Sequence, residues 1–148
     1  LMRFLIIAAF LVLAGCASNP YGNYSKAGRD LQAVMAMESV DRLAATYAPA
    51  KTTMVIGQKV KDGYGGALIS QLREKGFAVV EPWKLDMDEY QMPDNGKSLT
   101  YLINELGAGG DADNIYQVTL RVDTTRISRA FAEVKGKIMP MGFWALKE

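Results

Sequence analysis

The sequence predicts an α+β fold in which two helices pack on one face of a mixed, mostly antiparallel sheet. Residues 26–81 alternate two helical patterns with two short strand-like runs. Residues 99–146 contain only strand-like runs separated by turn residues. Helices and strands that are segregated along a chain in this way are typical of helices packed against one side of an antiparallel sheet.

The first predicted helix covers residues 26–47. Its apolar residues recur at spacings of three and four, as they do on the buried face of a helix. Pro49 ends the pattern because proline cannot continue a helix. The short β-branched run TTMVIGQ at residues 52–58 then predicts a strand.

The second predicted helix covers residues 63–75. Asp62 is the expected N-cap and Gly76 the expected C-terminal glycine. The run FAVVE at residues 77–81 predicts the next strand. The expected inner stripe of the helix consists of Tyr64, Ala67, Leu68 and Leu72.

The second half of the chain predicts a run of antiparallel strands. Residues 83–97 form a mixed loop, and the Gly/Asp-rich segment 107–113 predicts another loop. The residues from 115 to 122 alternate between apolar and polar side chains, which predicts a strand with one buried face. The predicted strands cover residues 99–106, 115–122, 126–134 and 138–146.

The apolar N-terminal segment ends in a Leu13-Ala14-Gly15-Cys16 motif, which resembles the lipobox of bacterial lipoproteins. Arg3 precedes an apolar run over residues 4–13, which is too short for a bilayer core that requires about 20 helical residues. We therefore expect a cleaved signal peptide at 1–15, a lipidated Cys16 with a flexible tether at 16–25, and one globular domain at 26–148.

The lipoprotein resemblance implies that Cys16 is acylated and that the chain is anchored to a membrane by lipid. Multiple acyl chains hold a protein far more firmly than one chain does. In the usual lipoprotein sorting, Ala17 in place of an aspartate implies the outer membrane. The expected location is therefore the periplasmic face of the outer membrane.

The composition excludes several classes of chemistry. The chain has no histidine, and its single cysteine is the expected lipidation site, which leaves no imidazole base and no thiolate ligand set. Without Arg3 the domain has equal numbers of basic and acidic side chains, which argues against a general nucleic-acid-binding surface. We therefore expect no enzymatic activity, no cofactor, no metal and no nucleic-acid partner.

Three weak motifs are better explained as local structure than as sites. The first is the acidic cluster of Asp86, Asp88 and Glu89, which we expect to be solvent-exposed loop residues and not a paired-carboxylate site. Residues 111–114 resemble the start of a calcium loop but lack its glycine and its final glutamate, so turn chemistry is the better interpretation. The glycines at 63–66 are expected to permit close packing of a helix start, although they could also cradle an anion.

Aromatic and methionine side chains gather in the 83–97 loop and in the last eleven residues. These residue types are enriched at the centres of protein interfaces, and an exposed terminal strand can extend a partner's sheet. Completion of the domain's own core is the alternative. Phe143 and Trp144 cannot both face one core under strict alternation, so one should point outward unless a bulge intervenes. The candidate partner surface consists of Trp83, Met87, Tyr90, Phe143 and Trp144.

Several segments together resemble the TrbH lipoproteins of conjugative transfer. The lipobox is one of them, and the others are YGGAL at 64–68, LREKGFAV at 72–79, IYQVTL at 115–120, SRAF at 128–131 and PMGFW at 140–144. The resemblance implies a non-enzymatic structural part of a type IV secretion apparatus, with envelope or secretion proteins as partners and a place in a larger complex. An alternative is a regulatory lipoprotein that docks on a cell-wall synthase, since the order of elements is also similar to LpoB-type and TolB modules.

Overall fold

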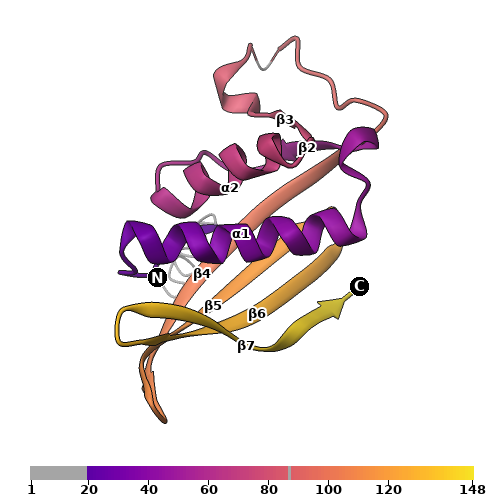
Figure 1. Ribbon diagram of the computed structural model, residues 1–148. Coiled ribbons are helices and arrows are strands. Elements are labelled where there is room, and N and C mark those ends of the chain that lie inside the picture. The colour runs from indigo at the N-terminus through magenta and orange to yellow at the C-terminus, as the bar shows by residue number, and fades with distance from the viewer. Residues whose placement is uncertain (1–19, 87) are drawn as a thin grey trace, which may run out of the picture.

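The computed structural model describes residues 20–86 and 88–148 of the chain. Two helices, α1 (Arg29–Thr46) and α2 (Gly63–Glu74), lie on the same side of one mixed sheet (Figure 1). The strand order through the sheet is β3 (Ala78–Val80), β2 (Thr53–Ile56), β4 (Gly96–Gly109), β5 (Ala112–Val122), β6 (Thr125–Val134) and β7 (Lys137–Lys147), and β1 (Gly22–Asn23) pairs with β4 beside this path. This arrangement confirms the α+β fold that the sequence predicts.

The helix α1 buries a stripe of side chains against α2 and the sheet. Its fully or nearly fully buried residues are spaced by one, three and four positions, which is one face of a helix. They are Met35, Ala36, Ser39, Val40 and Leu43. The helix ends at Thr46, and a short 3-10 helix, Pro49–Lys51, follows it. The proline thus terminates the helix as predicted.

The strand β2 (Thr53–Ile56), α2 and β3 (Ala78–Val80) form a parallel unit in which the helix connects two neighbouring strands. Asp62 is the N-cap of α2 and accepts a hydrogen bond from the Gly65 N–H at 3.0 Å. Tyr64, Leu68 and Leu72 are buried, as predicted, and Ala67 is partly buried against the same core.

Four long strands form the antiparallel half of the sheet and are joined by short turns. Tyr116, Val118, Leu120 and Val122 are buried, so the predicted alternation of β5 is confirmed. The turns at 123–124 and 135–136 leave two residues between paired strands. The bounds are β4 Gly96–Gly109, β5 Ala112–Val122, β6 Thr125–Val134 and β7 Lys137–Lys147.

The predicted loop at 107–113 is wrong, because most of it belongs to the hairpin between β4 and β5. Gly107 adopts a φ of +87°, which glycine reaches without strain, and the register between the two strands shifts on either side of it. The glycines therefore form bulges within a paired ladder and a tight turn at its end. Composition alone indicated a loop because bulges and loops favour the same residues.

The expected tether over residues 16–25 also needs a correction at its C-terminal end. Gly22–Asn23 forms the short strand β1, which pairs in parallel with Leu102 and Ile103 of β4. The Tyr24 N–H donates to the Ile103 carbonyl at 2.9 Å, and the Lys26 N–H donates to Glu105. Residues 22–26 are therefore bound to the sheet, and the tether ends earlier than the sequence indicated.

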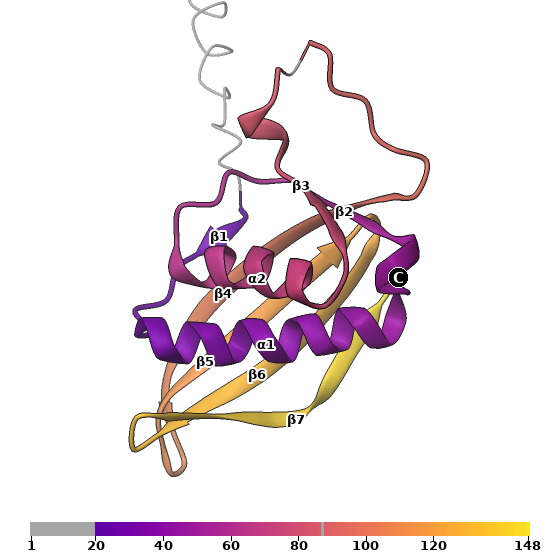
Figure 2. The same ribbon diagram turned by 45° about the horizontal axis from the view of Figure 1, so that its top comes forward.

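The core lies between the helices and the inner face of the sheet, and its largest buried side chains include Tyr64, Tyr101 and Phe131. Figure 1 and Figure 2 both show the helices α1 and α2 on this face of the sheet. Within residues 20–86 and 88–148, no helix combines the length and the apolar character that crossing a membrane requires.

Candidate functional site

The candidate partner residues do not form one surface. Trp83 and Tyr90 follow β3, at one edge of the sheet, whereas Phe143 and Trp144 belong to β7, at the opposite edge. Figure 1 shows the loop after β3 and the strand β7 far apart. The candidate residue Met87 and the expected lipidation site Cys16 lie outside the described residues. The sequence thus grouped residues from two separate regions as one candidate surface.

The region after β3 is a groove whose aromatic residues are half-buried. Trp83 lies in the 3-10 helix Pro82–Lys84 and packs against the core, while Tyr90 and Met92 lie farther along the loop. All three line a groove of about 600 Å³ whose floor includes residues 55–59 at the end of β2. The Trp83 ring therefore helps to complete the core, which is the alternative that the sequence left open.

The region on β7 exposes an aromatic ring completely. Phe143 is 94% exposed, whereas its neighbour Trp144 packs edge-on against Phe131 at a centroid distance of 6.1 Å. The Arg129 guanidinium lies 5.9 Å from the Trp144 ring centroid. One ring of the pair therefore faces the core and the other faces solvent, as predicted.

The strand β7 contains a bulge at the two rings. The register between β6 and β7 shifts between Ser128 and Ala130, where three residues of β7 stand opposite Arg129 alone. Gly142 in this bulge has a φ of +60°, and its carbonyl accepts a hydrogen bond from Arg129 Nη2 at 2.6 Å. Phe143 lies within this bulge, and its ring is exposed at the edge of the sheet.

The free edge of β7 is poorly suited to strand addition. Its turn leaves two residues between the strands, so Val134 and Lys137 form a hydrogen-bonded pair and the pairs alternate from there. Pro140, opposite Phe131, then points its nitrogen away from β6, where it offers no donor to an added strand. Together with the bulge, this proline interrupts the edge. A partner at β7 would therefore bind the protruding side chain more readily than the backbone.

The start of α2 is closed by the protein itself and offers no anion cradle. Asp62 accepts hydrogen bonds from the Gly65 N–H and from the Tyr101 hydroxyl, and Asn23 donates to it at 3.4 Å. A Cβ at Gly65 would lie 2.2 Å from the Tyr101 oxygen and 2.5 Å from Val60 Cγ1. The glycine thus serves close packing, which was the preferred interpretation from the sequence.

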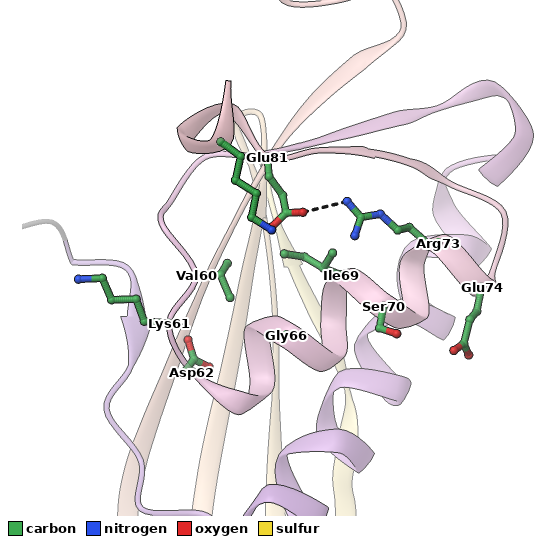
Figure 3. A pocket seen from close by; sticks show the side chains of 10 residues that line it. Val60, Lys61, Asp62, Gly66, Ile69, Ser70, Arg73, Glu74 and Glu81 are labelled. Carbon is green, nitrogen blue, oxygen red and sulfur yellow. Dashed lines mark hydrogen bonds and ion pairs between the residues drawn. The ribbon is translucent and has the colours of Figure 1, made fainter. Parts of the chain in front are cut away.

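A charged groove runs along the outer side of α2 (Figure 3). Glu81 forms ion pairs with Arg73 at 2.9 Å and with Lys84 at 2.8 Å. Burial opposes the ionisation of Glu81, but the hydrogen bonds and charges of Lys84 and Arg73 outweigh it and hold the pKa of Glu81 below its usual range. The charges of Arg73, Lys84 and Glu81 therefore satisfy one another within the groove.

The acidic segments form turns. The Asp88 N–H donates to Asp86 at 3.1 Å, and Asp113 accepts from the Lys135 N–H at 2.8 Å. Among residues 20–86 and 88–148, no three histidine, cysteine or acidic side chains are grouped to hold a metal ion. The side chains of the calcium-like segment instead support the adjoining hairpins.

Sequence reasoning missed a cleft on the outer face of the sheet, on the side away from the helices. Arg121 of β5 lies opposite Arg126 of β6, and both line a cleft of about 410 Å³ together with Pro20 and Tyr21. Arg121 Nη1 donates to the Tyr21 hydroxyl at 2.9 Å, and this hydrogen bond lowers the pKa of Tyr21. The two-residue hairpin at 123–124 could have predicted this pair, since it fixes the register of the two arginines.

Comparison with known proteins gives one match. A family model described as "Conjugal transfer protein TrbH" matches residues 18–148, which include every helix and strand described above. The searches of curated proteins and of solved structures gave no match.

Proposed function

Because the chain belongs to the TrbH family of conjugal transfer proteins, we propose that it is a lipid-anchored structural component of a conjugative type IV secretion apparatus. The observation that carries the proposal is the extent of the match, which covers the whole folded domain. The protein acts by binding other components of the apparatus and not by catalysis. Its place is the periplasmic face of the outer membrane.

The lipid on Cys16 raises the effective concentration of the domain at its partners. When the domain and its partners are confined to the same membrane plane, they meet at a high effective concentration. Modest contacts between them then suffice for stable assembly. The Leu13-Ala14-Gly15-Cys16 motif supports the anchor, and the attachment of residues 22–26 to β4 supports a short link between anchor and domain.

The contact with a partner protein is assigned to β7. Phe143 is fully exposed on a bulge that the Arg129–Gly142 hydrogen bond holds in place, so the ring is presented on a fixed backbone. A large aromatic side chain at the centre of an interface often contributes more binding energy than its neighbours. Met139 and Met141 of the same strand are also exposed and extend the apolar contact.

The test compares Phe143→Ser with Leu106→Ser in a strain that depends on this chain for plasmid transfer. Leu106 is 59% exposed and lies on β4, away from β7, so it controls for the loss of an exposed apolar side chain. Phe143→Ser should lower transfer frequency and the recovery of transfer proteins from a cross-linked envelope fraction. Leu106→Ser should leave both unchanged.

The anchor is tested separately with Cys16→Ser. This variant should incorporate no labelled palmitate and should lose its outer-membrane location. Labelled palmitate in the variant would refute lipidation at Cys16. Recovery of cell-wall synthases in place of transfer proteins with the wild-type chain would favour a regulatory lipoprotein and would contradict the proposed role.

A further inference from the structure

We propose that the outer face of the sheet binds the phosphate groups of anionic phospholipids in the membrane to which the chain is anchored. The face lies opposite the helices (Figure 2), and it carries the cleft at Arg121 and Arg126. The proposal rests on the lipid anchor at Cys16 proposed above. It adds a second membrane contact, made by the folded domain itself.

The strand side chains around the cleft carry charge of one sign. Strand residues alternate between the two faces of a sheet, so the side chains beside Leu102, Gln117 and Ser128 point outward. Within residues 98–104, 115–121, 126–132 and 139–147, every outward side chain is neutral or basic. The neighbouring Asp123 in the turn is already held by the Ser98 N–H and by Lys97 at 3.3 Å.

The basic residues form a row across three strands. Arg121 stands opposite Arg126, and Arg126 stands opposite Lys147. Like charges directly opposite one another destabilise a sheet, so this row is unfavourable unless an anion neutralises it. Guanidinium groups match phosphate oxygens in geometry, which makes a phosphate the fitting anion.

The cleft beside this row is built for an oxygen-rich ligand. Its walls carry the amides of Asn104 and Gln117 and the hydroxyls of Thr119 and Ser128 next to the arginines. Its volume of about 410 Å³ admits a headgroup.

The start of the domain places this face near the membrane. Pro20 and Tyr21 form part of the cleft wall. Cys16 precedes Pro20 by four residues, which span at most about 14 Å when fully extended. A lipid on Cys16 therefore keeps the cleft within reach of the headgroup layer. The chain segment that follows the anchor contacts Arg121 through the Tyr21 hydroxyl.

The experiment measures which side of the domain lies near the headgroups. The lipidated full-length protein carries a fluorophore on Ala145→Cys, an exposed outward position paired with Ser128, or on Ser70→Cys, an exposed position on α2. Cys16 is consumed by lipid, so each new thiol is unique. The protein is reconstituted in phosphatidylcholine vesicles with or without phosphatidylglycerol, and lipids with a headgroup quencher report proximity.

The label at 145 should be quenched more than the label at 70, and only when phosphatidylglycerol is present. Each basic side chain near an anionic surface changes partitioning about fivefold. Arg121→Gln with Arg126→Gln should therefore abolish most of the preference, as should high salt. The matched control is Lys59→Gln with Lys61→Gln, which removes two exposed charges elsewhere and should change nothing.

Equal quenching at 145 and 70, or quenching at 145 that ignores both phosphatidylglycerol and the arginines, would overturn the proposal while leaving the anchor intact. If the double arginine variant changed only the recovery of a partner protein, the face would bind protein, which also overturns it. Failure of the wild-type protein to float with any vesicle would instead refute the anchor, and this inference with it.

Discussion

The two faces of the sheet differ in how tightly they constrain the sequence. On the inner face, Tyr101 and Tyr64 are buried with their hydroxyls bonded to Asp62 and Ser39, and Gly65 leaves no space for a side chain. On the outer face, polar and basic side chains line an open cleft. The inner face is therefore optimised for stability, whereas the outer face and the β7 bulge keep groups that the fold does not need.

This difference indicates where function lies in a small domain without catalytic groups. A buried polar group that is bonded within the fold contributes to stability, and its loss costs about 1–3 kcal/mol. An exposed aromatic ring or an unneutralised row of cations contributes little to stability. Phe143 gathers with the exposed Met139 and Met141 on β7, and exposed apolar patches mark contacts with another molecule. Changes on the two faces should therefore separate stability from binding.

The largest effect is expected for Gly65→Ala on the inner face. The new Cβ would clash with the Tyr101 oxygen and with Val60, and would push α2 away from the sheet. Overpacking of this kind costs about 3 kcal/mol. Urea denaturation of the purified protein should show the loss in the free energy of unfolding.

The control for that change lies one residue further along the same helix. Gly66 has no heavy atom within 4 Å of a built Cβ, so Gly66→Ala gains helix propensity without a clash. It should stabilise the protein by about 0.5–1 kcal/mol. Equal destabilisation by both substitutions would show that helix geometry, and not the contact with Tyr101, makes glycine necessary.

The second comparison is between neighbours on β7. Trp144→Ser should cost about 2 kcal/mol of unfolding free energy, since the half-buried ring packs on Phe131 and Arg129. Phe143→Ser should change stability by less than about 0.5 kcal/mol, because the ring is exposed. Thermal melts of the two variants measure the difference. If both unfold the domain alike, Phe143 belongs to the core and β7 is not the interface.

The tyrosines of the two faces should ionise in different pH ranges. Burial, assisted by the hydrogen bond to Glu133, raises the pKa of Tyr116 to about 12, and burial raises the pKa values of Tyr64 and Tyr101 as well. The contribution of Tyr116 to stability is therefore complete below pH 10 and is lost as the pH rises through about 12. The pKa of Tyr21 on the outer face is lowered by Arg121.

Absorbance titration of tyrosinate measures this order. Tyr21→Phe should remove an early component of the titration curve, and alkaline unfolding should coincide with the late components. Should the early component survive Tyr21→Phe, the Arg121–Tyr21 contact that defines the outer cleft would not exist in solution.

The inner face was the predictable part of the molecule. Its signals are local: the spacing of apolar residues in α1, the Asp62 cap and the alternation along β5 each act over a few residues. The outer cleft depends on pairing between strands, and Arg121 meets Arg126 only because a two-residue turn sets the register. The contact between Tyr21 and Arg121 spans most of the chain and leaves no local signal.

The bulges mark a second limit of sequence reasoning. The glycines at 107–110 indicate either a loop or a bulged hairpin, and pairing with residues 112–115 decides between them. For the same reason, the sequence could not show that the candidate partner residues lie in two separate regions. Residues after β3 and residues on β7 look alike in composition, but strand order places them at opposite edges.

The smallest expected effect is on the outer face and has the opposite sign. Arg126 lies between Arg121 and Lys147 in the row of like charges. Arg126→Gln therefore removes the charge repulsion with both cross-strand neighbours. Because such pairs cost about 0.2–1 kcal/mol each, the variant should be slightly more stable than the wild type at low ionic strength. The gain should vanish at high salt, where exposed charges are screened. Chemical denaturation with urea at two salt concentrations measures it. A loss of stability at low salt would mean that Arg126 supports the fold, and the contrast between a stabilising inner face and a binding outer face would then fail at its central residue.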